Sequence, residues 1–101
     1  MLIGSNTFSS GLWAAEDFKR QAHAILVGTP TGGRPNSFGE QRSVELPHSG
    51  LTLYYSTRKW VRDPHHDPES LEPDVLVEAT YADLVGGRDA VLDAARKHNA
   101  K

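Results

Sequence analysis

Apolar residues in the first quarter of the chain recur at the spacing of one helix face. They fall at Leu12, Ala15, Phe18 and Ala22. Polar residues between them can face water, at Glu16, Lys19 and Arg20. Because an interval of three or four residues returns to the same side of a helix, the pattern predicts a helix over residues 10–23.

Three short apolar runs predict strands. Residues 2–4 precede the helix, residues 24–28 follow it, and residues 74–78 lie much further along the chain. A continuous apolar run that follows a helix is typical of a parallel strand buried on both faces. We therefore expect the first two strands to lie side by side, joined by the helix.

The middle of the chain predicts a hairpin between two loops. Residues 43–46 and 51–57 are β-rich and flank a Pro/Gly turn at 47–50. Three glycines and two prolines predict a loop over 29–39, and three prolines exclude a helix or a central strand over 63–73.

Two helices are predicted near the end of the chain, over residues 81–85 and 89–98, separated by Gly86 and Gly87. The order is then strand, helix, strand, hairpin, strand and helix, which predicts an α/β fold with a mixed layer and one crossover unit. The length of 101 residues is that of a single domain.

Composition narrows the function classes. The net charge of −2, with acidic and basic residues interspersed, predicts no nucleic-acid partner. No apolar run approaches the length of about 20 residues that crosses a membrane. The absence of cysteine excludes disulfides, thiolate metal sites and cysteine catalysis.

Ser9 is the residue with the most distinctive setting, because it stands where the first strand gives way to the predicted helix. A serine there can aim its Oγ at a carbonyl carbon, while backbone N–H groups at the start of the helix can bind the resulting oxyanion. The simpler interpretation is that Ser9 caps the helix. The two roles do not exclude each other.

The other candidate groups have interpretations that involve neither a ligand nor a reaction. His65, His66 and Asp67 are adjacent, and adjacent residues on an extended segment point apart, so we expect no metal site. The loop at 29–36 lacks the ending of a phosphate-binding P-loop. His23 fits a helix C-terminus and His48 a solvated turn. We interpret the aromatic residues as core and hairpin packing, at Trp13, Phe18, Tyr54, Tyr55 and Trp60. The alternative for Tyr55 and Trp60 is that they line a peptide-binding groove.

Five blocks of sequence, in order, resemble the C-terminal part of the catalytic domain of S41 serine peptidases, the tail-specific or C-terminal-processing proteases. They are the Thr-Phe-Ser-Ser motif at 7–10 and the stretches at 27–36, 46–51, 71–78 and 87–92. The resemblance covers nearly the whole chain. It implies a ClpP/crotonase-like fold of repeated strand–strand–helix units, here as a partial domain with a hairpin.

The resemblance also implies a catalytic mechanism and the residues that would take part in it. Ser9 would be the nucleophile that forms an acyl-enzyme, and the backbone N–H of Ser10 would donate to the oxyanion. In the processing-protease branch a lysine 25 residues after the nucleophile is the general base, but this chain has Arg34 there. An arginine cannot act as a base near neutral pH, because its pKa exceeds about 12. Arg34 could instead bind a substrate carboxylate or pair with a nearby acid.

Relatives similar to the tricorn-type peptidases use an upstream histidine and a downstream acid, for which Asp67 or Glu69 stands at a suitable distance. We therefore expect a single, incomplete domain over residues 1–101, with the base supplied by upstream sequence, no cofactor, and a peptide or protein substrate. Homo-oligomers, or association with the upstream part, are the expected assemblies. The family implies a bacterial exported, periplasmic or cell-envelope protein, although we recognise no targeting signal in this sequence.

Two other functions stay open. One is a catalytically incompetent peptidase domain that binds peptides or supports assembly, which Arg34 favours. The other is an acyl-CoA enzyme of the crotonase type. It is the weaker alternative, because such enzymes use no nucleophilic serine and the Thr-Phe-Ser-Ser motif would have no role.

Overall fold

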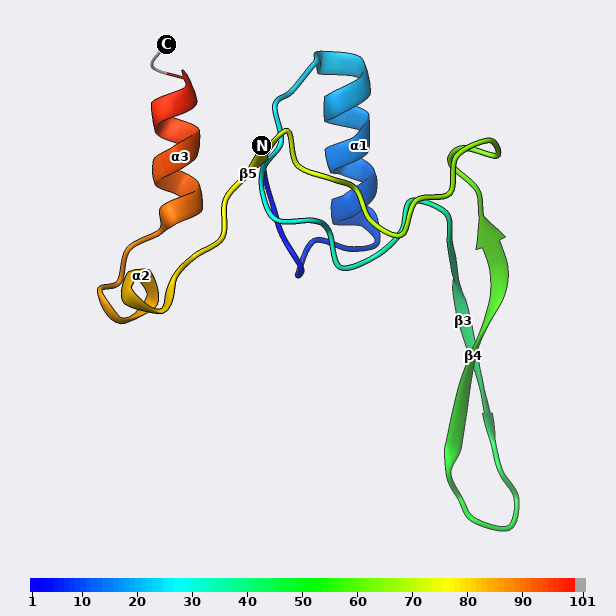
Figure 1. Ribbon diagram of the computed structural model, residues 1–101. Helices are drawn as coiled ribbons and strands as arrows, with labels where there is room; N and C mark the ends of the chain where they lie inside the picture. Colours follow the sequence, from blue (N-terminus) through cyan, green and yellow to red (C-terminus); the bar gives the residue numbers. More distant parts are fainter. Residues whose placement is uncertain (100–101) are drawn as a thin grey trace.

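A small parallel sheet lies at the centre of the protein (Figure 1). The computed structural model describes residues 1–99. The sheet contains β1 (Leu2–Ile3), β2 (Val27–Gly28) and β5 (Val75–Leu76), in the order β1-β2-β5. Both neighbouring pairs are parallel, and Val27 pairs with the first residue of each neighbour. The expected parallel strands are confirmed, although each is shorter than its apolar run predicts.

Two helices lie on opposite sides of this sheet (Figure 1). On one side, α1 (Ser10–Ala22) buries Leu12 and Ala15. Ala15 belongs to the core cluster with Ile3 of β1 and Leu26 before β2. The first half of the predicted helix face, Leu12 and Ala15, is therefore buried, whereas Phe18 and Ala22 in its second half are exposed.

On the other side, α3 (Ala90–Asn99) contacts β1 and β2. A short helix, α2 (Tyr81–Val85), precedes it. Thr80 caps α2: its hydroxyl accepts from the backbone N–H of Asp83, and the Asp83 carboxylate accepts from the backbone N–H of Thr80. This reciprocal box satisfies two donors that the start of a helix otherwise leaves open.

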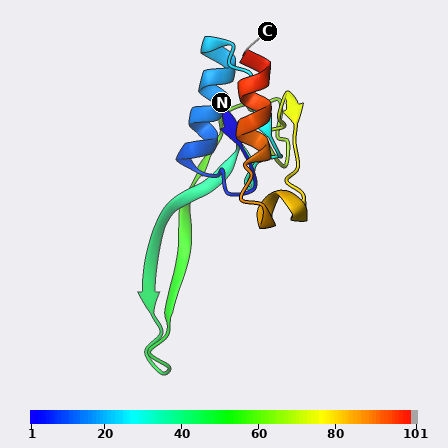
Figure 2. The ribbon, with the colours of Figure 1, turned by 90° about the vertical axis from the view of Figure 1, so that its left-hand side faces the viewer.

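A long hairpin leaves the body of the protein (Figures 1 and 2). Its strands are β3 (Ser37–Glu45) and β4 (Thr52–Trp60), and they are antiparallel. The predicted hairpin is confirmed, but both strands extend further toward the body, and β3 begins inside the predicted 29–39 loop. The molecule measures 60 × 37 × 16 Å as a result.

The five aromatic residues expected in core and hairpin packing differ in their outcome: Tyr54 and Tyr55 lie on the hairpin, whereas a core position for Phe18 is wrong. Trp13 and Trp60 do meet edge to face, with ring centroids 5.6 Å apart. Phe18, Tyr54 and Tyr55 are exposed. The two tyrosines are exposed because the part of the hairpin that carries them projects into solvent, beyond the contact of Trp60 with α1.

The structure confirms a mixed α/β fold. Among residues 1–99, no helix combines the length and the hydropathy needed to cross a bilayer. The buried apolar set is small and consists of Ile3, Leu12, Ala15, Leu26, Val27 and Ala90. The loops that follow β1 and β2 lie next to this core, and they carry the candidate site.

Candidate active site around Ser9

Ser9 has a strained backbone. Its φ of 53° and ψ of −127° lie where side-chain-bearing residues are uncommon. Ser9 immediately precedes α1, but its side chain makes no capping hydrogen bond. The simpler interpretation, in which the hydroxyl of Ser9 caps the helix, is therefore wrong. The hydroxyl is exposed and has no hydrogen-bond partner within residues 1–99.

The start of α1 offers an open backbone donor beside this hydroxyl. The N–H groups of Gly11 and Leu12 both donate to the carbonyl of Phe8, at 3.1 and 3.4 Å. The N–H of Ser10 finds no acceptor in the described part of the chain. The first turn of α1 also contains no acidic residue. The positive end of the helix dipole is thus not neutralised, which favours a negative charge at this point.

A tight turn brings the chain from β1 to Ser9. The backbone N–H of Thr7 donates to the carbonyl of Gly4 at 2.7 Å, and the Thr7 hydroxyl accepts from the N–H of Gly4 at 3.1 Å. These two bonds close a loop of four residues between β1 and the helix. The threonine of the Thr-Phe-Ser-Ser motif therefore positions Ser9 through the backbone.

The loop after β2 packs on this turn. The N–H of Gly32 donates to the carbonyl of Thr7 at 3.1 Å. A Cβ on Gly32 would lie 1.9 Å from the carbonyl oxygen of Ser5, and one on Gly33 would lie 3.5 Å from the Cβ of Phe8. Only glycine fits at position 32, since the two backbones touch there.

A third segment, residues 62–72, supports this loop. Thr31 and Leu71 are joined twice: the backbone N–H of Thr31 donates to the carbonyl of Leu71, and the Thr31 hydroxyl accepts from the N–H of Leu71 at 2.8 Å. Buried Asn36 holds the same segment further along. Its side-chain oxygen accepts from the N–H groups of Arg62 and Asp63, and its amide nitrogen donates to the carbonyl of Asp63 at 2.8 Å.

The structure brings two of the sequence-predicted residues together. Arg34, on the loop after β2, forms an ion pair with Glu69 at 3.6 Å. Both side chains are exposed, so the pair is weak. Asp67 is exposed and makes no hydrogen bond or ion pair within residues 1–99. The assignment of either acid to a catalytic role remains a prediction.

No histidine in the described part of the chain reaches Ser9 through a hydrogen bond. His23 follows the last residue of α1, about 20 Å along the helix axis from Ser9. His48 lies in the turn at the tip of the hairpin. His65 is exposed, and His66 lines a pocket beside α1. Residues 1–99 hold no group of three side chains suited to a metal ion.

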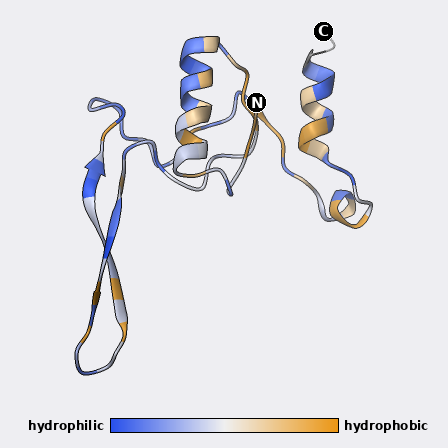
Figure 3. Ribbon diagram, turned by 180° about the vertical axis from the view of Figure 1, so that it is seen from behind, coloured by the Kyte–Doolittle hydropathy of each residue, from blue (hydrophilic) through white to orange (hydrophobic). Residues whose placement is uncertain are grey.

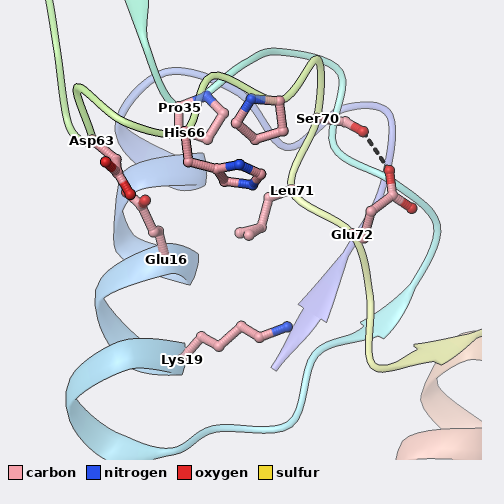
Figure 4. A pocket seen from close by; sticks show the side chains of 9 residues that line it. Glu16, Lys19, Pro35, Asp63, His66, Ser70, Leu71 and Glu72 are labelled. Carbon is pink, nitrogen blue, oxygen red and sulfur yellow. Dashed lines mark hydrogen bonds between the residues drawn. The ribbon is translucent and has the colours of Figure 1, made fainter.

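The pocket lies between α1 and the segment that precedes β5 (Figure 4). Its volume is about 250 Å³. The imidazole of His66 points into it, and the charged groups at its wall have partners: Glu16 accepts from Arg62, and Lys19 donates to Asp74. Ser9 does not line this pocket, so the pocket and the candidate nucleophile are separate features.

Two clusters of charged residues hold α1 in place beside the segments that support the site. Arg62 donates to Glu16 at 2.9 Å and also to Asp17, and the hydrogen bond to Glu16 raises the pKa of Arg62 above its ordinary value. The Lys19 ammonium, 2.7 Å from Asp74, lowers the pKa of that carboxyl, and the N–H of Leu26 contributes in the same direction. Both clusters tie α1 to distant segments.

Sequence reasoning missed two of these supports, Asn36 and Arg62. Asn36 is the only one with a signal that could have found it, because a polar residue between a Pro-rich loop and a β-rich run is a frequent loop anchor. Arg62 gives no such signal. Its partners lie 45 and 46 residues earlier in the chain, so only the folded structure identifies them.

Comparisons of the chain with protein-family models, with curated proteins and with solved structures found no match.

Proposed function

We propose that this chain is the nucleophile-bearing, C-terminal part of a serine peptidase catalytic domain of the S41 type, with a ClpP/crotonase-like fold. The observation that carries the proposal is the backbone of Ser9. A positive φ in a residue other than glycine costs about 1–3 kcal/mol. Strain of this kind, with an exposed hydroxyl at a strand-to-helix turn, is typical of an activated serine nucleophile.

The chemistry follows from this position. The Ser9 Oγ attacks the carbonyl carbon of a peptide bond and its proton passes to a general base. The C–N bond then breaks, the amine leaves with that proton, and water hydrolyses the acyl-enzyme. The open N–H of Ser10, at the positive end of α1, donates to the oxyanion. These steps need no metal or organic cofactor.

The general base is the part that residues 1–99 do not supply. Arg34 carries a guanidinium, a group that does not serve as a general base, and is paired with Glu69. No histidine or lysine among the described residues makes a hydrogen bond to Ser9. In our proposal the base therefore comes from another segment or chain, as in relatives of the resembled family that use an upstream histidine.

A fluorophosphonate probe tests the assignment, because it reacts with activated serines. We expect the gene product in its source cells to carry the phosphonate on the tryptic peptide that ends at Lys19. Ser9→Ala should abolish this labelling. Ser10→Ala is the matched control and should keep it, because alanine retains the backbone N–H. Labelling that survives Ser9→Ala would contradict the proposal.

A second candidate function is a peptide-binding or assembly module without catalysis. The Arg34–Glu69 pair favours it, since arginine replaces the lysine that would act as a base in the resembled family. A folded gene product that binds peptides and never reacts with the probe would support this function and count against catalysis.

A further inference from the structure

The protein has more surface than its size requires. Its solvent-accessible area is 7458 Å². A compact monomer of 11.1 kDa exposes roughly 5,650 Å². The radius of gyration, 17.7 Å, likewise exceeds the value of about 13 Å for a compact chain of this length. The excess area is about 1,800 Å² per chain, and obligate homodimers bury about 1,000–2,500 Å² per chain.

The hairpin contributes to this excess. Every residue from 40 to 59 is exposed, and β3 and β4 pack mainly against each other, with Trp60 at the base of the hairpin meeting Trp13 of α1. Apolar positions lie in its distal half (Figure 3), where Val44 and Leu53 are cross-strand partners. A two-stranded ribbon alone is at best marginally stable in water. A third strand along one edge would stabilise it.

The two edges of the hairpin differ. Glu40 in β3 has a φ of 55°, which interrupts the backbone hydrogen bonding between β3 and β4. At this point the Thr57 hydroxyl donates to the carbonyl of Glu40 instead. The strand β4 has no residue with positive φ. Its first six residues, 52–57, contain no charge, proline or glycine. Such an edge is suited to pairing with another strand.

We propose that β4 pairs with β4 of a second copy of this chain, antiparallel and centred on Ser56, about a two-fold axis. The proposal does not depend on the chemistry at Ser9. In this register Tyr54 of each copy lies opposite Arg58 of the other, on the same face of the new four-stranded sheet. Each Arg58 already stacks over Trp60, 4.0 Å from the ring centroid.

This register argues for a second copy of the chain as the partner. The only cations of β4 are Arg58 and Lys59, at its end near the body. Antiparallel pairing therefore separates the cations of one copy from those of the other and places them beside the uncharged half of the partner strand. The two Tyr54–Arg58 pairs are favourable cross-strand contacts of aromatic and cation.

The mass in solution is the first test. Sedimentation equilibrium at micromolar concentration should give twice the mass that denaturing mass spectrometry gives for one protein chain. Tyr54→Arg places two arginines opposite each other at two points and should weaken the dimer about tenfold or more. Tyr81→Arg, the same change at an exposed residue of α2, should leave the dimer intact. The double variant Tyr54→Arg with Arg58→Glu should restore it.

A cysteine variant tests the register without destabilising the ribbon. The chain has no cysteine. Ser56→Cys places the two sulfurs across the axis, where directly opposed Cα atoms lie about 4.5–5.5 Å apart, within the span of a disulfide. It should form a covalent dimer on mild oxidation. Ser43→Cys, on β3 of the same hairpin, should do so much more slowly.

Three results would overturn the proposal. A monomer would mean that a different protein or segment covers the hairpin. A dimer that Tyr54→Arg does not weaken would place the interface elsewhere. Equal cross-linking of Ser56→Cys and Ser43→Cys would exclude the register. Circular dichroism of each variant separates a loss of pairing from a loss of folding.

Discussion

The backbone N–H of Gly32 donates a hydrogen bond of 3.1 Å to the carbonyl of Thr7. These residues lie on the loops that follow two neighbouring strands, 25 positions apart in the sequence. Since Thr7 is two residues before Ser9, this bond connects the loop after β2 to the candidate nucleophile. The geometry of Ser9 therefore depends on a contact that is long-range in sequence and short-range in space.

Replacing Gly32 tests how closely the two loops must approach. In Gly32→Ala the new Cβ would lie 1.9 Å from the carbonyl oxygen of Ser5, so the backbone must move. We expect a loss of about 1–3 kcal/mol in the free energy of unfolding. Gly11→Ala is the control, because its Cβ meets only an ordinary contact at 4.0 Å. Urea denaturation measures both, and equal midpoints would contradict this expectation.

Because the backbone of Ser9 is strained, a substitution that relieves this strain should stabilise the protein. Ser9→Gly should raise the free energy of unfolding by about 1 kcal/mol, because glycine adopts a positive φ without a steric penalty. Ser10→Gly, in the first turn of α1, should lower it instead. Thermal and chemical unfolding of the two variants give the sign of each change. A less stable Ser9→Gly would mean that the backbone of Ser9 is not strained.

Asn36 is expected to matter more for stability than any exposed polar residue. It is buried and joins the start of β3 to residues 62–66 through both ends of its amide. Asn36→Ala leaves the N–H groups of Arg62 and Asp63 without their acceptor. We expect a cost of roughly 2–3 kcal/mol. Ser43→Ala on the exposed hairpin should change little, and urea denaturation compares the two.

The ion pair of Lys19 and Asp74 predicts part of the acid dependence. The hydrogen bond from Lys19 lowers the pKa of Asp74 in the folded protein, so the pair stabilises the fold above the ordinary carboxyl pKa of about 3.9. That contribution decreases as the pH falls from about 3.9 and is lost once the pH has passed through the lowered pKa of Asp74. Between these two pKa values the unfolded state binds the proton more readily than the folded state.

We therefore expect Asp74→Asn to be less stable than the parent at neutral pH and to lose less stability on acidification below about pH 4. Asp67→Asn is the control, since Asp67 is exposed and has no partner within residues 1–99. Melting temperatures measured across the acid range provide the comparison. Parallel curves for parent and Asp74→Asn would show that the pair contributes nothing.

The sequence by itself determined the elements and their order. The apolar spacing at Leu12 and Ala15 gave the helix face, and the Pro/Gly turn at 47–50 gave the hairpin. It also pointed to Ser9 as the residue at the strand-to-helix turn. These features are local, because periodicity and turn residues act over a few positions of the chain.

Only the tertiary structure decided what surrounds those elements. It placed Gly32 against Ser5, buried Asn36 between two loops, and left Tyr54 exposed on a projecting hairpin. It also showed that the hydroxyl of Ser9 is free and does not cap α1. This outcome depends on the turn before α1, which the loop after β2 holds through the hydrogen bond from Gly32 to Thr7. The physical reason is that these outcomes follow from contacts between segments distant in sequence, which no local pattern of residues encodes.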